Sequence, residues 1–313
     1  MLHRFINFFY LNKKSNLFEF RDYNKTSKIK IAITYSTDIN YIYPTLVSMT
    51  SLIINGGNNT IYYIFILHTP TFSEKNKHIF NTLENKYKDR CRIIYINMGK
   101  MYKNLKFKKT LSLSAYYRLS LQDILPNINK IIYLDGDTLV LGDLKELIDL
   151  DMKGNVVMGF IDDEPSSIES FGLINSTVIC SGVLLLDLRG LRENNYSKKI
   201  EDFISKNRNR LIQEDQTIVN VVMQDRLGPI PPKYGIWPLT NKEKLERYLN
   251  IKRSGKKYSK KSLLNAIKHP VIIHFVGRKP FWSRKSDNVF DKIWWNFARA
   301  SGYYDEIYKS IKN

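Results

Sequence analysis

Residues 130–141, KIIYLDGDTLVL, place two aspartates one residue apart directly after a run of apolar side chains. The apolar run 131–134 is typical of a strand that is buried on both faces of a sheet. Aspartate is disfavoured in strands, and burying an unpaired charge is costly. On an extended chain Asp135 and Asp137 point to the same side, and Gly136 between them lets the backbone approach a ligand closely. The stretch predicts a core strand whose carboxyl end holds two carboxylates that need a positive charge.

Strands and helices alternate along the chain that precedes this stretch. Pro44 stands near the first turn of one predicted helix and Gly56 near its end, as helix boundaries favour. The pattern predicts strands over 28–36, 61–68, 91–98 and 130–134, with helices over 44–56, 73–88 and 114–125. This alternation predicts an α/β fold with a Rossmann-like, mostly parallel, doubly wound sheet and helices on both faces. Ligands bind such sheets beyond the carboxyl ends of the strands, so we expect residues 36–40 and 135–137 to meet at one rim.

The whole chain of 313 residues is long enough for one large α/β domain. We expect an N-terminal extension over 1–27, a catalytic domain over 28–282, and an aromatic, basic, helical tail over 283–313. Cys91 and Cys180 are the only cysteines and lie far apart, which argues against a disulfide framework and favours a reducing compartment. The N-terminal stretch is too interrupted to span a bilayer and lacks a signal-peptide cleavage site, so we expect a cytoplasmic protein.

The formal net charge of +19 favours an anionic partner, which can be nucleic acid, an acidic membrane surface or a phosphorylated substrate. Basic residues that only solubilise the surface explain the charge equally well. No zinc-finger spacing, RNA-recognition motif or leucine zipper accompanies the charge, so no specific nucleic-acid binding is expected. The tail around Trp294 and Trp295 leaves two alternatives: docking on an anionic membrane surface, which we favour, or packing as a helix on the domain.

A second group of polar residues follows another apolar run near the C-terminus. His274 comes directly after VII at 271–273, and Gly277, Lys279 and Trp282 follow it. An imidazole added to two carboxylates shifts a site from Mg²⁺ towards Mn²⁺. Gly277 permits a tight turn around a phosphate, and Lys279 supplies a mobile cation for it. The two groups together are typical of a divalent cation that binds a diphosphate and assists its departure. Taken singly, the aspartate pair is more often a surface turn, and the histidine is more often structural.

From residue 28 to the aromatic tail, the chain resembles the retaining glycosyltransferases of family 8, which include glycogenin and bacterial lipopolysaccharide galactosyl- and glucosyltransferases. The similar motifs occur in the family's order: ITYSTDINY (33–41), SAYYRL (114–119), YLDGDTLV (133–140), CSGVLLLDL (180–188), EDQTIV (214–219) and HFVGRKPFW (274–282). Each motif is modest alone. Their order and their spread over most of the chain make the resemblance specific.

The resemblance implies a GT-A fold, a UDP-sugar donor and Mn²⁺ held by Asp135, Asp137 and His274, with Mg²⁺ as the other candidate ion. It implies that Asp215 and Gln216 face the transferred sugar, with Gln216 near the anomeric carbon on the β face. The positions that would contact the donor or its metal are Ser36, Asp38, Asn40, Tyr41, Arg118, Asp135, Gly136, Asp137, Ser181, Gly182, Gly277, Arg278 and Lys279.

The activity that the resemblance implies is retaining hexosyl transfer from UDP-glucose or UDP-galactose to a glycan or glycolipid such as lipopolysaccharide, with α linkage. A peripheral position at the inner face of the membrane would suit such an acceptor. The alternatives are a glycogenin-like self-glucosylating protein and a non-catalytic nucleotide-sugar-binding protein of the same fold. Cys180 stands where the family usually has Asn, which leaves the sugar open. The last motif is one residue shorter, which leaves two alternatives: Lys279 is displaced, or Arg278 shares its phosphate contact.

Overall fold

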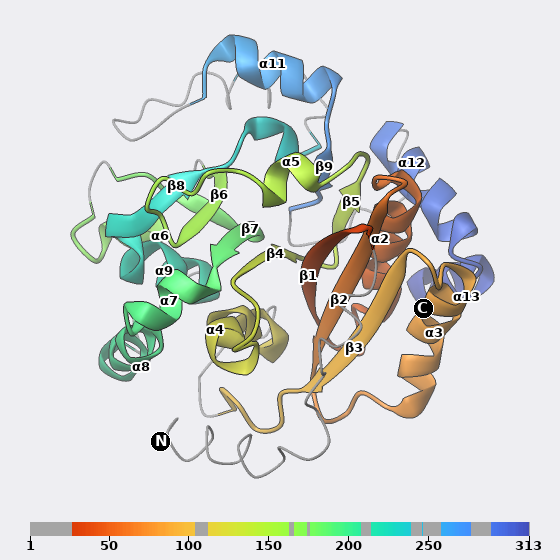
Figure 1. The fold of residues 1–313 in the computed structure, drawn as a ribbon, viewed down its shortest axis with the longest axis horizontal. Coiled ribbons are helices and arrows are strands. Elements are labelled where there is room, and N and C mark those ends of the chain that lie inside the picture. The colour runs from red at the N-terminus through yellow and green to blue at the C-terminus, as the bar shows by residue number, and fades with distance from the viewer. Residues whose placement is uncertain are drawn as a thin grey trace.

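The structure, a computed structural model, describes residues 27–103, 112–162, 166–173, 176–207, 214–238, 246, 258–276 and 289–312. Its centre is a seven-stranded sheet with the strand order β3-β2-β1-β4-β7-β6-β8. Helices cover both faces of the sheet (Figure 1). The strands are β1 (Ile29–Thr37), β2 (Thr60–His68), β3 (Cys91–Asn97), β4 (Lys130–Leu134), β6 (Val157–Ile161), β7 (Ile179–Asp187) and β8 (Leu227–Pro229). The mostly parallel, doubly wound α/β fold is confirmed.

The first four strands are parallel and agree with the predicted ranges to within one residue at each end. Alternate residues of β2 face opposite cores, because successive side chains of a strand point to opposite faces. Ile64 packs in the core that also holds residues of the helices α2 and α3, whereas Phe65 packs in the core under η2, α8 and α9. β1 lies between β2 and β4, with Tyr35 in register with Leu134. The carboxyl ends of β1 and β4 therefore meet at one rim, as expected.

β7 runs antiparallel to β4, and this direction brings its amino end to the same rim. Leu134 at the end of β4 pairs with Val183, and Asp135 N–H donates to the carbonyl oxygen of Gly182 at 2.8 Å. A separate two-stranded sheet pairs β5 (Thr138–Val140) with β9 (Ile272–His274) in antiparallel register, with Thr138 opposite His274. Both predicted metal motifs are thus joined by main-chain pairing rather than by flexible loops.

The helices predicted over 44–56 and 73–88 are present, with bounds that differ from the prediction by one or two residues at each end. Ser73 caps α3 through a complete capping box with Asn76. The predicted helix over 114–125 is instead the 3-10 helix η2 followed by the single turn α4. The tighter winding stacks Arg118 over Ala115, whose carbonyl oxygen accepts a hydrogen bond from Arg118 Nε at 2.9 Å. The helices are α2 (Ile42–Asn55), α3 (Glu74–Lys86), η2 (Leu113–Ser120), α4 (Leu121–Ile124), α5 (Lys145–Ile148), α6 (Ser166–Glu169), α7 (Leu188–Glu193), α8 (Tyr196–Asn207), α9 (Glu214–Val222), η3 (Gln224–Arg226), η4 (Pro232–Tyr234), α11 (Lys260–Lys268), α12 (Val289–Ala300) and α13 (Tyr304–Lys312).

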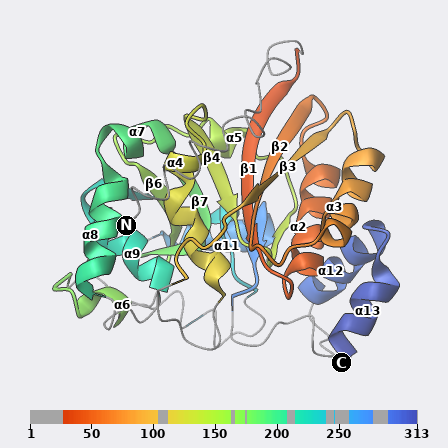
Figure 2. The same cartoon turned by 90° about the horizontal axis from the view of Figure 1, so that it is seen from below.

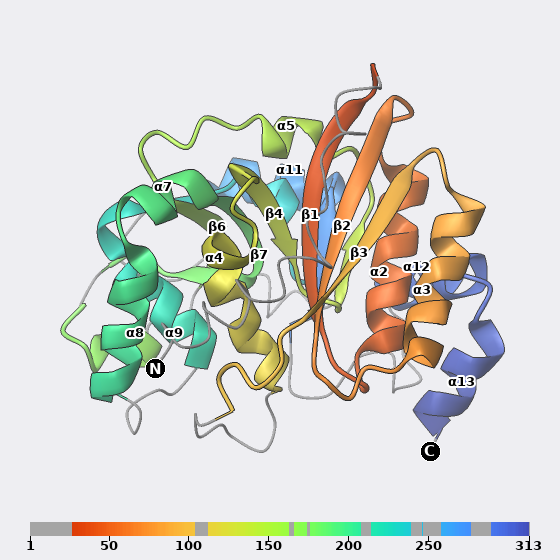
Figure 3. The same ribbon diagram turned by 60° about the horizontal axis from the view of Figure 1, so that its bottom comes forward.

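The described part of the C-terminal tail packs on the domain. α12 and α13 lie beside α2 and α3 at one end of the sheet, while α7, α8 and α9 gather at the other end (Figures 2 and 3). Trp294 is fully buried and shares a small core with Val47, Leu139 and Ile273. Trp294 is therefore unavailable to a membrane surface, and of the two alternatives for this residue the packed helix is correct. The domain boundaries at 27/28 and 282/283 stay predictions, since residues 1–26 and 277–288 lie outside the described ranges.

Within these described ranges, no helix combines the length and the hydropathy that crossing a bilayer requires.

Candidate active site

The turn between β4 and β5 holds the two carboxylates. Thr138 closes the turn, because its N–H and its hydroxyl both donate to the carbonyl oxygen of Asp135, at 3.2 and 2.8 Å. Gly136 lies against α2, and a Cβ there would stand 2.4 Å from Thr45 Oγ1. Close packing against α2 thus favours Gly at the middle of the Asp-Gly-Asp sequence.

Asp135, Asp137 and His274 bring one ligand atom each to within 4.8 Å of one another. His274 Nε2 lies 3.2 Å from Asp137 Oδ1 and 3.7 Å from Asp135 Oδ2. The main chain holds this geometry: His274 N–H donates to the carbonyl oxygen of Ile236, and Phe275 N–H donates to that of Asp137, at 2.9 and 3.0 Å. The cluster predicted from residues far apart in the sequence is therefore assembled by the pairing of β5 with β9.

These residues fit a divalent cation. A carboxylate oxygen and a ring nitrogen both present lone pairs, so Asp137 Oδ1 and His274 Nε2 lie this close only with a proton or a metal ion between them. Burial lowers the pKa of His274, but charge interactions with Cys180 and Asp137 more than offset burial, and the pKa lies well above its ordinary value. Two carboxylates and an imidazole suit Mn²⁺ or Mg²⁺.

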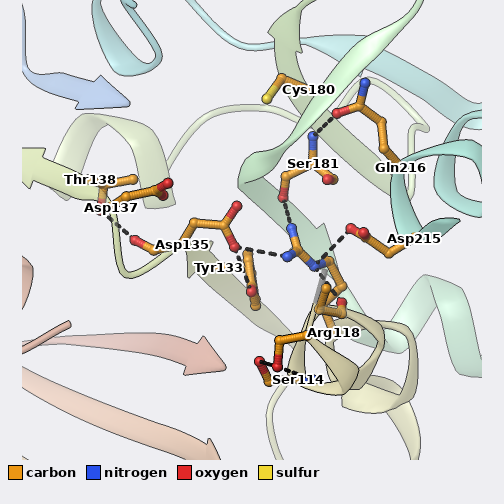
Figure 4. Close-up of polar contacts among 12 residues, drawn as sticks. Ser114, Arg118, Tyr133, Asp135, Asp137, Thr138, Cys180, Ser181, Asp215 and Gln216 are labelled. Atoms are coloured by element: carbon orange, nitrogen blue, oxygen red, sulfur yellow. Dashed lines mark hydrogen bonds and ion pairs between the residues drawn. The ribbon is translucent and has the colours of Figure 1, made fainter. Parts of the chain in front are cut away.

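Arg118 connects Asp135 of the three-residue cluster to another carboxylate, that of Asp215 (Figure 4). Its side chain is almost fully buried, with Nη2 at 2.8 Å from Asp135 Oδ1 and Nε at 3.2 Å from Asp215 Oδ2. The guanidinium stacks 4.1 Å from the ring centroid of Tyr133, and Nη1 donates to the carbonyl oxygen of Ser181. The structure thus places Arg118 among protein groups, as the shared counter-charge of Asp135 and Asp215.

Asp162 is a residue of the site that the sequence analysis missed. Gln216 Nε2 donates to Asp162 Oδ2 at 2.7 Å, and Gln216 Oε1 accepts from Ser181 N–H at 3.1 Å. Both ends of the Gln216 amide are therefore fixed. Asp162 is buried and directly follows β6, as Asp135 directly follows β4. The acidic residues in FIDDE (160–164), placed directly after an apolar run, were the signal that could have found it.

The predicted nucleoside-contacting residues lie at the end of β1. Asp38 folds the turn there by accepting from Asn40 N–H through its side chain at 2.8 Å and from Tyr41 N–H through its carbonyl oxygen at 3.1 Å. The Tyr41 ring borders the turn that carries Asp135 and Asp137, because a Cβ at Gly136 would stand 3.4 Å from Tyr41 Cδ1. Burial raises the pKa of the Tyr41 hydroxyl well above its usual value, and the two nearby aspartates add to the rise. Ser36 is buried at the same strand end.

β7 supplies the remaining predicted positions at this rim. Ser181 meets Arg118 and Gln216 through its main chain, and Gly182 lies against His274. The predicted contacts Gly277, Arg278 and Lys279 lie outside the described residues.

Comparison with known proteins shows which proteins this chain is similar to. The chain is 24% identical over 280 residues to lipopolysaccharide 1,2-glucosyltransferase of Escherichia coli, which covers 87% of this chain and 78% of that relative. The solved structure of galactosyltransferase LgtC, in complex with donor and acceptor sugar analogs, has a TM-score of 0.71 at 19% identity, over 86% of this chain and 96% of LgtC. The bifunctional glycosyltransferase WbbM has a TM-score of 0.74 at 19% identity, and this chain, matched over 91% of its length, spans 52% of WbbM.

The structural likenesses show that the fold is the GT-A fold. Residues 32–286, well over half of the chain, match the family model described as Glycosyl transferase family 8. The chain therefore belongs to glycosyl transferase family 8.

Proposed function

We propose that the protein is a retaining, metal-dependent hexosyltransferase that moves glucose or galactose from a UDP-sugar to a glycan or glycolipid such as lipopolysaccharide, with α linkage. Family membership supports transfer of a sugar, and the relatives named above are a lipopolysaccharide glucosyltransferase and a galactosyltransferase. The observation that carries the proposal is the cluster of Asp135, Asp137 and His274 at the rim where such sheets bind ligands.

The three side chains would hold Mn²⁺ or Mg²⁺, which when bound neutralises charge on the departing diphosphate. The two oxygens of Asp135 have different neighbours, and this difference orients the carboxylate. Oδ1 accepts hydrogen bonds from Arg118 Nη2 and from the Tyr133 hydroxyl, both at 2.8 Å. Oδ2 faces His274 Nε2 at 3.7 Å. Arg118 and Tyr133 thus hold Oδ1 of Asp135, and Oδ2 stays available on the side of His274.

Gln216 is our candidate for the group that meets the anomeric carbon. Its amide is held at both ends, by Asp162 and by the main chain of Ser181, so its oxygen occupies a fixed position when positive charge develops on the sugar. A neutral amide oxygen on the β face stabilises that charge, while the acceptor hydroxyl attacks from the face that UDP leaves. The product then keeps the α configuration of the donor.

The test is a UDP-release screen over UDP-glucose, UDP-galactose and their N-acetylated counterparts, with Mn²⁺, with Mg²⁺ and with chelator. We expect one hexose donor to be turned over only when a divalent cation is present. Asp137→Ala is expected to lower the rate by about 100-fold or more. The matched control is Asp149→Ala, because Asp149 is an exposed aspartate whose side chain pairs with the exposed Lys145 one helical turn away.

Three outcomes would contradict the proposal: no donor turned over, full activity in chelator, or an Asp137→Ala protein as active as Asp149→Ala. The anomeric proton coupling of the isolated product, read by NMR, decides between retention and inversion. Intact-protein mass spectra taken after incubation with donor alone would reveal the self-glycosylating alternative as added hexose units.

A further inference from the structure

One face of β7 lies against the imidazole ring of His274, at both edges of the ring. Cys180 and Gly182 are two residues apart on this strand and so point to the same side. A Cβ at Gly182 would stand 2.0 Å from His274 Cε1 and 2.7 Å from Asp135 Oδ2, so the strand leaves room there for the ring and the carboxylate. Cys180 Sγ lies 3.6 Å from His274 Nδ1. The strand thus offers an empty position at one edge of the ring and a thiol at the other.

The two ring nitrogens of His274 have different surroundings. Nε2 faces the carboxylates of Asp135 and Asp137, and Nδ1 faces Cys180. A histidine that lends the lone pair of Nε2 to a metal carries its proton on Nδ1, and that proton needs an acceptor. Among the described residues, the sulfur of Cys180 is the hydrogen-bond partner of Nδ1. Both residues are about 5% exposed, so little water reaches this contact.

We propose that Cys180 is a positioning residue for metal binding in this protein. Its sulfur accepts the Nδ1–H of His274, which fixes the tautomer that presents Nε2 to the cation and holds the ring towards the two carboxylates. The inference rests on the divalent-cation site of the proposed function. The inference gives Cys180 a role at the position where the family usually has Asn.

The test measures metal affinity directly, without turnover. Metal-free wild type, Cys180→Ala and Cys180→Ser are titrated with Mn²⁺, and free Mn²⁺ is followed by electron paramagnetic resonance. We expect Cys180→Ala to raise the Kd by about 10- to 100-fold, as loss of a partner behind a ligating histidine typically does. Cys180→Ser should recover most of the affinity, since a hydroxyl also accepts a hydrogen bond. Cys91→Ala is the matched control, because Cys91 is a buried thiol in β3, remote from the cluster in sequence and sheet order.

An unchanged Kd for Cys180→Ala, or a Cys180→Ser protein no better than Cys180→Ala, would overturn the inference and leave the proposed metal site standing. A folded wild type that binds neither Mn²⁺ nor Mg²⁺ would overturn the metal site itself. A second measurement needs no cysteine variant: ¹⁵N–¹H correlation spectra of Mg²⁺-saturated wild type, with His274 assigned by His274→Gln. We expect the proton on Nδ1, and a proton on Nε2 would contradict the inference.

Discussion

Arg118 is a single buried cation between two carboxylates that belong to different parts of the site. Burial lowers the pKa of its guanidinium, but Asp135 and Asp215 raise it by more, so the group stays charged inside the protein. Burial also raises the pKa of Asp215, and Arg118 works against that rise. The three groups therefore stabilise one another, and none is well accommodated without the others.

Replacing Arg118 by methionine is expected to lower the free energy of unfolding by about 3–5 kcal/mol, because it leaves buried carboxylates without their counter-charge. Urea denaturation at neutral pH measures the change. Adding Asp215→Asn to Arg118→Met should recover part of the loss. Arg189→Met is the control: the pair of Arg189 with Glu193 is exposed, and such pairs contribute about 0–1 kcal/mol. Equal stability of Arg118→Met and wild type would refute the shared role.

Residues of the site could be predicted from the sequence where a charge breaks an apolar run. Asp135, Asp137 and His274 all stand at strand ends, and the structure brings them together. The partners behind them could not be predicted in the same way. The contacts of Asp162 with Gln216 and of Cys180 with His274 depend on how β6, β7 and β9 lie side by side, and no local pattern encodes that arrangement.

Strands marked by a local apolar run could be predicted from the sequence. The pairing and direction of strands that lie far apart in the sequence could not. β4 has the predicted bounds because its apolar run is bounded by polar residues on both sides. The antiparallel direction of β7 and the small sheet of β5 with β9 depend on contacts across many residues. The 3-10 winding of η2 goes together with the side-chain bond of Arg118 to the carbonyl oxygen of Ala115, which helix propensity does not report.

The closeness of β7 to the imidazole predicts a steric effect at Gly182. Gly182→Ala places a Cβ that would stand 2.0 Å from His274 Cε1, so the ring or the strand must move. We expect the substitution to destabilise the fold by about 1–3 kcal/mol and to weaken Mn²⁺ binding at least tenfold. Thermal unfolding and the Mn²⁺ titration measure the two effects.

Gly142→Ala is the matched substitution for that test. Its Cβ would stand 3.3 Å from a methyl group of the Val271 side chain, a distance that small adjustments relieve. It should leave Mn²⁺ binding unchanged. Equal Mn²⁺ affinity of the Gly182→Ala and Gly142→Ala proteins would show that β7 does not constrain the ring.

At the scale of the whole molecule, the C-terminal helices are part of the catalytic fold. Trp294 and Ala298 of α12 share a core with Leu139 of β5 and Ile273 of β9. Leu139 directly follows Thr138 in the chain, and Ile273 directly precedes His274. Thr138 and His274 pair with each other, and His274 is one of the three residues of the proposed cation site. α12 therefore supports the small sheet that carries the cluster, while Trp295 of the same helix packs edge-on against Tyr304 of α13.

The net charge of +19 and the exposed ring of Tyr308 predict binding to an anionic membrane surface. We expect the protein to sediment with phosphatidylcholine vesicles only when they also contain phosphatidylglycerol, and to be released by high salt. Tyr308→Ser should weaken this binding. Ile54→Ser is the matched control, since Ile54 on α2 has a similar exposure, 41% against 42%. The prediction would be wrong if the protein bound vesicles equally well without phosphatidylglycerol, or if it bound no vesicles at all.

Because β5 pairs with β9, the proposed cation site can form only after residue 274 has been synthesised. On the ribosome, Asp135 and Asp137 emerge long before His274, and at typical rates of synthesis the delay is on the order of ten seconds. Arg118, whose Nη2 lies 2.8 Å from Asp135 Oδ1 in the folded protein, precedes both aspartates in the chain and is therefore made before them. A chain released before residue 274 therefore carries the two carboxylates and Arg118 but lacks the third ligand of the proposed cation site.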